Sequence, residues 1–235
     1  MTDNLETTLK ALDLFGKLDP EKKVEIIKPK VKRNETLDLI VNGYEKGLEN
    51  YGLYEKGKLK IKIPGGEYWK YYIAKISASL EIPSERITEF SLLLEEHENK
   101  NYFEYFTGWY LSALINGSRD KDFKIITNYL SKTIDYIGYK NTKNIDVNGN
   151  VGGLIGDGMK GGKITVNGNA GDWVGDCMED GEITINGNAR DGVGGYMEGG
   201  KIHLNGDYKS LSDYIPGGNI YHRGKLIVKN GRRLI

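Results

Sequence analysis

A repeat of 19 residues constrains the fold of this chain more than any other feature. The phrase Ile-Thr-Val-Asn-Gly at 164–168 returns as Ile-Thr-Ile-Asn-Gly at 183–187, and related copies begin at Ile145 and Ile202. This period is too short for repeats of paired helices, and the copies lack the leucine-rich signature. A segment of this length buries its apolar residues only when it stacks on the copies before and after it. The repeat therefore predicts a solenoid.

Each copy has the pattern of a short strand followed by a tight corner. Ile164 and Val166 alternate with Thr165, so the first two should face inward and the threonine outward. A corner should follow at 167–169, because glycine and asparagine both tolerate positive φ. Stacked turns would lie about 4.8 Å apart, joined by backbone hydrogen bonds. We predict a short, single-stranded, right-handed parallel β-helix, with the hand that parallel crossovers share.

Stacking places equivalent residues of successive turns in columns. The apolar columns should fill the core, and they consist of Ile145, Ile164, Ile183 and Ile202, of Val147, Val166, Ile185 and Leu204, and of Met159, Met178 and Met197. An asparagine column should be joined by side-chain amides, and two glycine columns should mark the bends. These structural repeat positions are Asn148, Asn167, Asn186 and Asn205, then Gly149, Gly168, Gly187 and Gly206, and then Gly156, Gly175 and Gly194.

The distribution of glycine predicts two domains. Residues 1–140 hold 10 of the 32 glycines and residues 141–235 hold 22. The first segment is predicted to be helical, and the second to be the β-helix with two C-terminal capping strands around Asn230-Gly231. Apolar periodicity and capping residues predict helices over 3–15, 20–28, 34–49, 68–80, 84–97, 102–116 and 121–138. The predicted fold class is therefore α+β multidomain, an N-terminal helical bundle followed by the β-helix.

Composition excludes several classes of protein. Lys+Arg and Asp+Glu are both 33, which argues against a nucleic-acid binder and against a polybasic membrane anchor. The single cysteine, Cys177, excludes a disulfide framework and a cysteine-built zinc or iron–sulfur site. The apolar runs are shorter than a membrane span, and the polar, acidic start is unlike a secretory signal. We expect a cytoplasmic protein with no nucleic-acid or membrane partner and with no catalytic, cofactor or metal residues of its own.

Residues 145–218 resemble the glycine-rich repeat domain called GXGXG. The resemblance is carried by the phrase at 167–185, Asn-Gly-Asn-Ala-Gly-Asp-Trp-Val-Gly-x-x-Met-x-x-Gly-x-Ile-x-Ile, and by Gly-Gly-Asn-Ile-Tyr-His at 217–222. That domain forms the C-terminal part of the glutamate synthase large subunit and makes up most of one of the subunits of formylmethanofuran dehydrogenase. The resemblance implies a right-handed β-helix that acts as a structural or scaffolding part, with catalytic cofactors on other domains or subunits.

Aromatic residues provide the candidates for an interface. Tyr102, Phe106 and Trp109 share one face of the helix predicted at 102–116. This face is either the core of the helical segment, its contact with the β-helix, or a surface for a partner, since aromatic residues anchor interfaces. Trp173, in the repeat, is a further candidate.

Two functional hypotheses follow from these patterns. The first is a non-catalytic scaffold or protein-interaction subunit, which holds a partner protein or a second copy, in an assembly like formylmethanofuran dehydrogenase or glutamate synthase. The alternative is an enzyme or small-molecule-binding protein with its site in the cleft between the two domains. That alternative requires a deep pocket near residue 140 lined by titratable groups.

Overall fold

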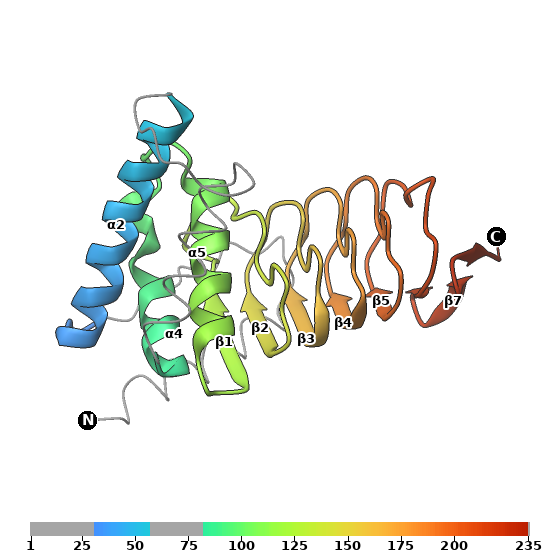
Figure 1. Ribbon diagram of the computed structural model, residues 1–235. Helices are drawn as coiled ribbons and strands as arrows, with labels where there is room; N and C mark the ends of the chain where they lie inside the picture. Colours follow the sequence, from blue (N-terminus) through green and yellow to red (C-terminus); the bar gives the residue numbers. More distant parts are fainter. Residues whose placement is uncertain (1–30, 57–81, 235) are drawn as a thin grey trace.

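The computed structural model describes residues 31–56 and 82–234, which form a group of helices at one end of a solenoid (Figure 1). The predicted helices at 3–15, 20–28 and 68–80 lie outside these residues. The helices are α2 (Glu35–Glu55), α4 (Ser84–Leu93), the 3-10 helix η1 (Leu94–His97) and α5 (Phe103–Gly117). The strands are β1 (Asp122–Ile126), β2 (Asn144–Asn148), β3 (Lys160–Asn167), β4 (Asp180–Ile185), β5 (Lys201–Leu204), β6 (Asn219–His222), β7 (Lys225–Lys229) and β8 (Arg232–Arg233).

The strands form one sheet in which neighbours in sequence are neighbours in space, in the order β1 to β8. From β1 to β6 every pairing is parallel, and β7 and β8 add antiparallel pairings at the end. A strand that pairs in parallel with the next strand along the chain requires one complete turn between the two. The predicted parallel β-solenoid is therefore confirmed.

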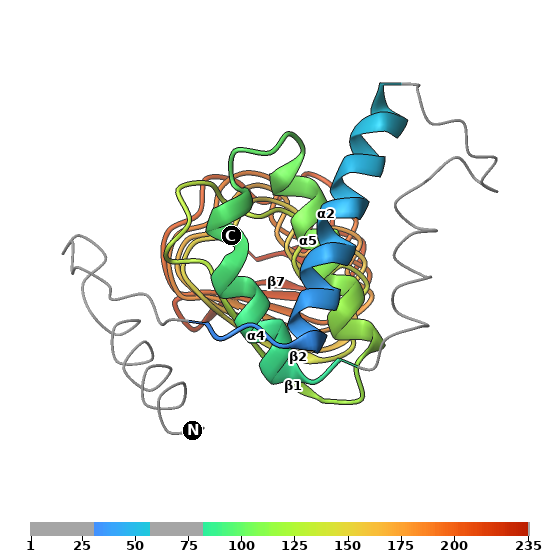
Figure 2. The same ribbon diagram turned by 90° about the vertical axis from the view of Figure 1, so that its left-hand side faces the viewer.

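The predicted isoleucine column fills the solenoid core. Ile145, Ile164, Ile183 and Ile202 pair in register, and each is at most 2% exposed. The column is longer than predicted, because Phe123 precedes it and Ile220 follows it. Viewed from the helical end, the successive turns lie one behind another around this core (Figure 2). The methionine column is also completely buried.

The predicted asparagine column is joined by side-chain hydrogen bonds. The Asn167 Nδ2 amide donates to Asn148 Oδ1 at 2.9 Å, and the same bond from Asn186 to Asn167 measures 2.7 Å. A second polar column, absent from the prediction, uses the side-chain oxygens as acceptors for the backbone of the next turn. Asn150 Oδ1 accepts from the backbone N–H of Asn169 at 2.9 Å, and Asn169 Oδ1 accepts from that of Asn188 at 2.8 Å.

Glycine occupies the two glycine columns for different physical reasons. At Gly175, φ is +69°, in the left-handed region that favours glycine, as at its equivalents one turn away. Gly168, Gly187 and Gly206 lack this conformation, so the predicted reason, positive φ at the corner, is wrong for them. They permit close approach instead, because a Cβ on Gly187 would lie 2.6 Å from the Gly168 carbonyl oxygen.

Three of the predicted helices are confirmed. The helix predicted at 34–49 is α2, and Asn34 Oδ1 caps it by accepting from the Leu37 N–H at 3.0 Å. The helix predicted at 84–97 is α4 followed by the tighter turn η1, and the helix predicted at 102–116 is α5. Of these helices, α4 and α5 pack against the first turn of the solenoid, and α2 packs on α4 and α5. A helical bundle is not confirmed.

The predicted helix at 121–138 is wrong, because these residues form the first turn of the solenoid. Their strand, β1, pairs with β2. Tyr136 and Gly138 have φ of +60° and +79°, which an α-helix excludes. The solenoid therefore begins before the glycine-based boundary at residue 140.

Helix α4 closes the outer edge of β1. The Thr88 hydroxyl donates to the Lys124 carbonyl at 2.8 Å, and Ser91 Oγ accepts from the Ile126 N–H at 3.1 Å. An open strand edge would leave such backbone groups available to another chain. Two hydroxyl side chains thus form hydrogen bonds with the β1 backbone that a neighbouring strand would otherwise form.

Helix α5 covers the corner of the same first turn. The buried Ser112 hydroxyl donates to the Tyr136 carbonyl and accepts from the N–H groups of Gly138 and Tyr139, at 3.0, 2.9 and 3.1 Å. Gly108 lies so close that a Cβ would be 1.6 Å from the Asp135 carbonyl oxygen. The helical part and the solenoid share one continuous hydrophobic core.

The predicted capping strands are confirmed as β7 and β8, which pair around Asn230-Gly231. These two residues have φ of +47° and +76°, as a two-residue hairpin turn requires. A second turn of this kind, absent from the prediction, joins β6 to β7 at Arg223-Gly224. None of the helices in the described part of the chain combines the length and apolar character needed to cross a bilayer.

Candidate interaction surface

The structure separates the four aromatic residues that were candidates for an interface. Phe106 and Trp109 are 2% and 7% exposed and belong to the core, so they are not available to a partner. The Trp109 ring lies 4.9 Å from the Tyr136 ring of the first solenoid turn, centroid to centroid. Tyr102 is half-buried, with its ring packed edge-on against Tyr51. Only Trp173 is largely accessible, at 43% exposure.

Trp173 belongs to a corner that recurs in four turns of the solenoid. The corner consists of residues 135–140, 153–158, 172–177 and 191–196, which we call the corner ridge. In each segment the second, fourth and sixth residues have positive φ, as at Trp173, Gly175 and Cys177. Backbone hydrogen bonds join the segments in register, for example from the Trp173 N–H to the Asp191 carbonyl at 2.7 Å. The alternating conformation turns the second and sixth side chains outward, as the exposed Trp173, Cys177 and Tyr196 show.

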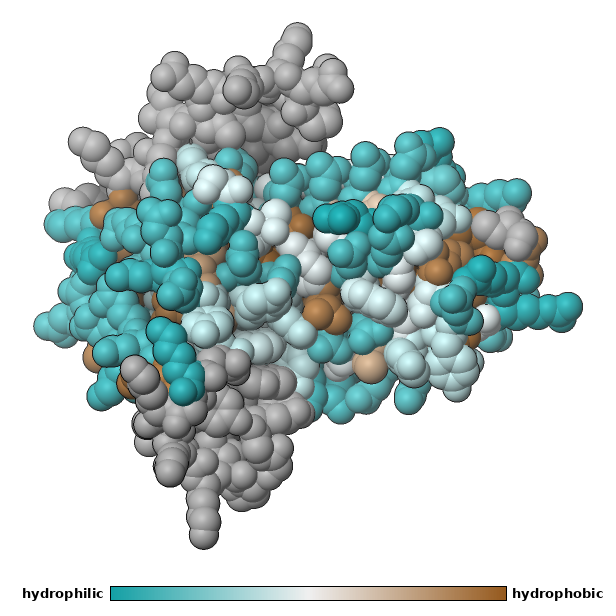
Figure 3. Space-filling view, turned by 90° about the horizontal axis from the view of Figure 1, so that it is seen from above, coloured by the Kyte–Doolittle hydropathy of each residue, from teal (hydrophilic) through white to brown (hydrophobic). Residues whose placement is uncertain are grey.

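Exposed aromatic side chains gather along the corner ridge. Among the described residues six large hydrophobic side chains are exposed, and four of them lie on or beside the ridge: Tyr105, Trp173, Tyr196 and Tyr214. Tyr196 and Tyr214 contact each other edge-on at 5.3 Å between ring centroids, and Tyr105 lies 6.4 Å from the Tyr136 ring. Hydrophilic residues cover most of the face seen from above, with hydrophobic residues in small patches (Figure 3).

The Trp173 ring is held in place by the following turn. A Cβ on Gly192 would lie 2.8 Å from the indole, and a Cβ on Gly195 would lie 3.0 Å from it. The ring therefore rests on a bare glycine backbone while much of its surface stays accessible. An aromatic side chain fixed in this way loses little conformational entropy when it binds a partner.

Three titratable side chains meet beside Trp173. Asp157, Asp176 and Cys177 each place a ligand-type atom within 4.8 Å of the others. Burial raises the pKa of the Asp176 carboxyl. Burial, followed by the charges of Asp176 and Asp157, raises the pKa of the Cys177 thiol to about 11. A thiol in this state is protonated at neutral pH, which is the opposite of what a nucleophilic cysteine requires.

The same three groups are a weak donor set for a metal. Two carboxylates and a thiolate are acceptable ligands for divalent metals such as zinc. However, one Asp176 oxygen faces the next turn, where a Cβ on Gly195 would lie 2.4 Å from it. That oxygen is buried and has no hydrogen-bond partner among the described residues. The cluster is better described as a local concentration of negative charge on the ridge.

The raised thiol pKa predicts slow alkylation of Cys177. We expect iodoacetamide to react with the folded protein at pH 8 about tenfold more slowly than with the unfolded chain, because the loss of thiolate outweighs its greater nucleophilicity. Because Cys177 is the only cysteine, the alkylated fraction measured by mass spectrometry reports on this site alone. The double variant D157N/D176N should react faster than the parent. Equal rates for the folded and unfolded chains would contradict the prediction.

Ionisation of two carboxylates in neighbouring turns should change the stability of the protein in opposite directions. Burial raises the pKa of Asp176, so the protein loses stability as the pH rises from the ordinary aspartate pKa through the higher folded-state pKa. Hydrogen bonds from Lys209 and Ser210 lower the pKa of Asp191, so its ionised form stabilises the fold. At pH 7 we expect D176N to melt above the parent and D191N below it. Both differences should vanish in acid, where both carboxyl groups are protonated in the parent. Shifts of the same sign in thermal melts at pH 7 would contradict this assignment.

Among the residues that the structure describes, the cleft required by the alternative hypothesis is not found near residue 140. The contact of α5 with segment 135–140 is closely packed, as Gly108 and Ser112 show. An open groove of about 380 Å³ lies instead between α4 and the first two strands. It is lined by Ser84, Glu85, Thr88, Asp122, Phe123, Lys124 and Asp146.

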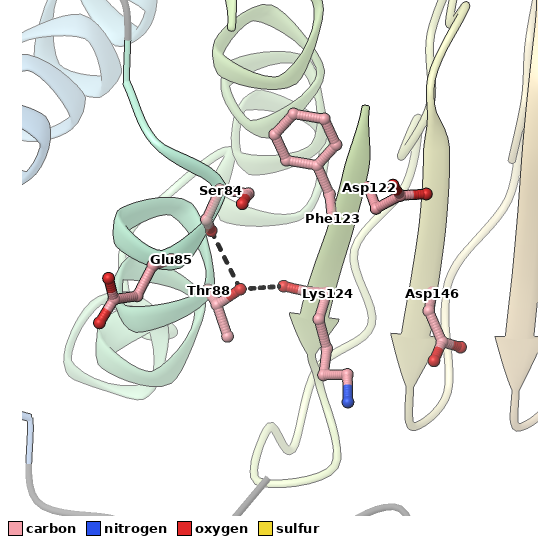
Figure 4. A pocket seen from close by; sticks show the side chains of 7 residues that line it. All are labelled: Ser84, Glu85, Thr88, Asp122, Phe123, Lys124 and Asp146. Carbon is pink, nitrogen blue, oxygen red and sulfur yellow. Dashed lines mark hydrogen bonds between the residues drawn. The ribbon is translucent and has the colours of Figure 1, made fainter. Parts of the chain in front are cut away.

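The charged groups of this groove do not converge on one point. Figure 4 shows Glu85 pointing away from Lys124 and Asp146, while Thr88 is engaged with backbone carbonyls. General acid–base chemistry requires its groups within reach of one substrate atom. The groove therefore has the character of a surface depression and offers no catalytic constellation.

The corner ridge was not predicted from the sequence, although a signal for it is present. The tetrapeptide Asp135-Tyr-Ile-Gly in the first turn matches Asp172-Trp-Val-Gly in the third. An alignment on this motif, instead of on Asn-Gly, would have identified the first turn and the row of outward aromatic positions.

Comparisons of the chain with protein-family models, with curated proteins and with solved structures gave no match.

Proposed function

We propose that this protein is a non-catalytic scaffold or protein-interaction subunit built on a GXGXG-type β-helix. The observation that carries the proposal is the filled interior of the solenoid. Core side chains from Phe123 to Val228 are at most 8% exposed, and the stacked turns leave most of their polar and charged side chains on the outside. Such a body provides a rigid surface of fixed shape. Ligand sites are usually concave, whereas the grooves at the β1–β2 edge and beside the corner ridge are open to solvent.

The proposal extends to the kind of assembly that the sequence resemblance implies. In a formylmethanofuran dehydrogenase-like or glutamate synthase-like complex, the β-helix would hold subunits that carry the redox cofactors. The chain offers a suitable contact region, because its exposed aromatic residues gather on the corner ridge. Aromatic residues contribute strongly to protein–protein interfaces.

The test is to isolate the affinity-tagged full chain from its native host after chemical cross-linking in the cell. Mass spectrometry should identify either a stoichiometric partner or cross-links between two copies, and light scattering should give the matching mass. A partner that carries iron–sulfur or flavin cofactors would support the proposed assembly. A monomer without a cross-linked partner would overturn the scaffold proposal.

A further inference from the structure

We propose that the corner ridge binds a cationic, arginine- or lysine-rich segment of a partner protein. This inference rests on the scaffold function proposed above and deepens it by giving the surface and the chemistry of its partner. It depends on two independent properties of the ridge, its excess of carboxylates and its exposed aromatic rings.

Negative charge is concentrated on the ridge although the chain as a whole is neutral. Seven carboxylates lie on the ridge or shift the pKa of its titratable groups through their charge: Glu104, Asp135, Asp157, Asp172, Asp176, Asp191 and Glu198. Three cationic side chains accompany them: Lys140, Arg190 and Lys209. The excess of acidic groups creates a negative potential that attracts a positively charged segment and repels an acidic one.

The aromatic rings favour the same kind of partner. An ammonium or guanidinium group is attracted to the face of a tryptophan or tyrosine ring, and a guanidinium also stacks on it. Trp173 and Tyr196 are 43% and 57% exposed, and both belong to the turns that also carry Asp176 and Asp191. A side chain that carries positive charge on an apolar stem can therefore contact ring and carboxylate together.

The chain itself provides an example of the ion pair that such a segment would form. Arg190 lies 3.5 Å from Asp172, nitrogen to oxygen, at an exposed position. Both residues line an open groove of about 350 Å³ beside the ridge, together with Asp135 and backbone of the second and third turns. A guanidinium group from a partner would be attracted by the same kind of charge, since the carboxylates of the ridge outnumber its cations.

The dimensions of the ridge suit an extended peptide better than a single ion. The aromatic residues extend from Tyr136 in the first turn to Tyr214, four turns further along the stack. At about 4.8 Å per turn this row of aromatic residues spans roughly 19 Å, the length of about six residues of extended chain. We therefore expect a short linear segment with several positive charges.

The test measures binding of fluorescein-labelled hexa-arginine to the full chain by fluorescence anisotropy, with hexa-glutamate as the matched anionic probe. Hexa-arginine should bind, hexa-glutamate should not, and added salt should weaken the binding. W173A, Y196A and D157N/D176N should each weaken binding about fivefold or more. The variants L39A and E35Q, which alter an exposed apolar and an exposed acidic residue of α2 away from the ridge, should bind as the parent does.

Circular dichroism must first show that each variant is folded. The variant Y196A, at an exposed position, provides a test that does not depend on the packing of Trp173. Equal binding of both peptides, or equal losses from E35Q and D157N/D176N, would overturn the inference. A partner from the native host that cross-links only to residues outside the ridge would also overturn it. That last result would leave the scaffold proposal intact. A monomer without a partner that still binds hexa-arginine through the ridge would support the proposed binding surface and overturn the scaffold proposal.

Discussion

Replacement of Gly108 by alanine should lower the free energy of unfolding by about 3 kcal/mol. An alanine inside a helix normally stabilises it by about 1 kcal/mol relative to glycine, so the expected sign is reversed. The reason is that the new Cβ would lie 1.6 Å from the Asp135 carbonyl oxygen and 2.8 Å from its carbonyl carbon. Both atoms belong to the backbone, so α5 and the first turn of the solenoid would have to move apart.

Urea denaturation monitored by circular dichroism would measure this effect. The matched control is Gly52→Ala in α2, where the new Cβ would meet only the Tyr102 ring at an ordinary 3.5 Å. This variant should be as stable as the parent or slightly more stable. If G108A were to unfold at the same urea concentration as G52A, the described contact between α5 and the solenoid would be incorrect.

Replacement of Ile183 by alanine should destabilise the protein by about 3 kcal/mol, because it leaves a cavity in the middle of the isoleucine column. Ile183 is completely buried and pairs with Ile164 before it and Ile202 after it. Each turn of a solenoid is stabilised mainly by its neighbours, so the damage should spread to the turns on both sides. Hydrogen exchange measured by mass spectrometry should show faster exchange in β3, β4 and β5 than in α5.

The control for this variant is Thr184→Ala, at the next position in the same strand. The Thr184 side chain faces outward and is only partly buried. Its replacement should change the free energy of unfolding by less than about 1 kcal/mol. Similar losses for the two variants would mean that the inward and outward faces of β4 have been assigned incorrectly.

The repeat predicts most of the solenoid because identical residues recur at a fixed spacing. Ile164 and Ile183 show which face of each strand is inside, and Asn167 marks where each strand ends. The first turn lacks these marks. Its strand pairs with β2 at a spacing of 22 residues, and Ile126 stands where later turns have asparagine. A short apolar run of this kind does not distinguish a buried strand from a helix.

The candidate surface was less predictable than the fold. Helical periodicity places Phe106 and Trp109 on one face, but it does not tell whether that face meets the core or a partner. The outward direction of Trp173 depends on a left-handed backbone conformation, which its residue type does not signal. The ridge also joins residues from four turns, so its charge and its aromatic character emerge only when the turns are stacked.

The closed ends of the stack determine how the protein can assemble with other molecules. At the first rung, hydroxyl groups of α4 form hydrogen bonds with the backbone of β1. At the last rung, the short strand β8 consists of two exposed arginines, Arg232 and Arg233. Neither edge presents a long bare strand on which another copy could continue the ladder. Growth into a fibre is therefore disfavoured, and a binding partner must approach the long sides of the stack, where it meets several rungs at once.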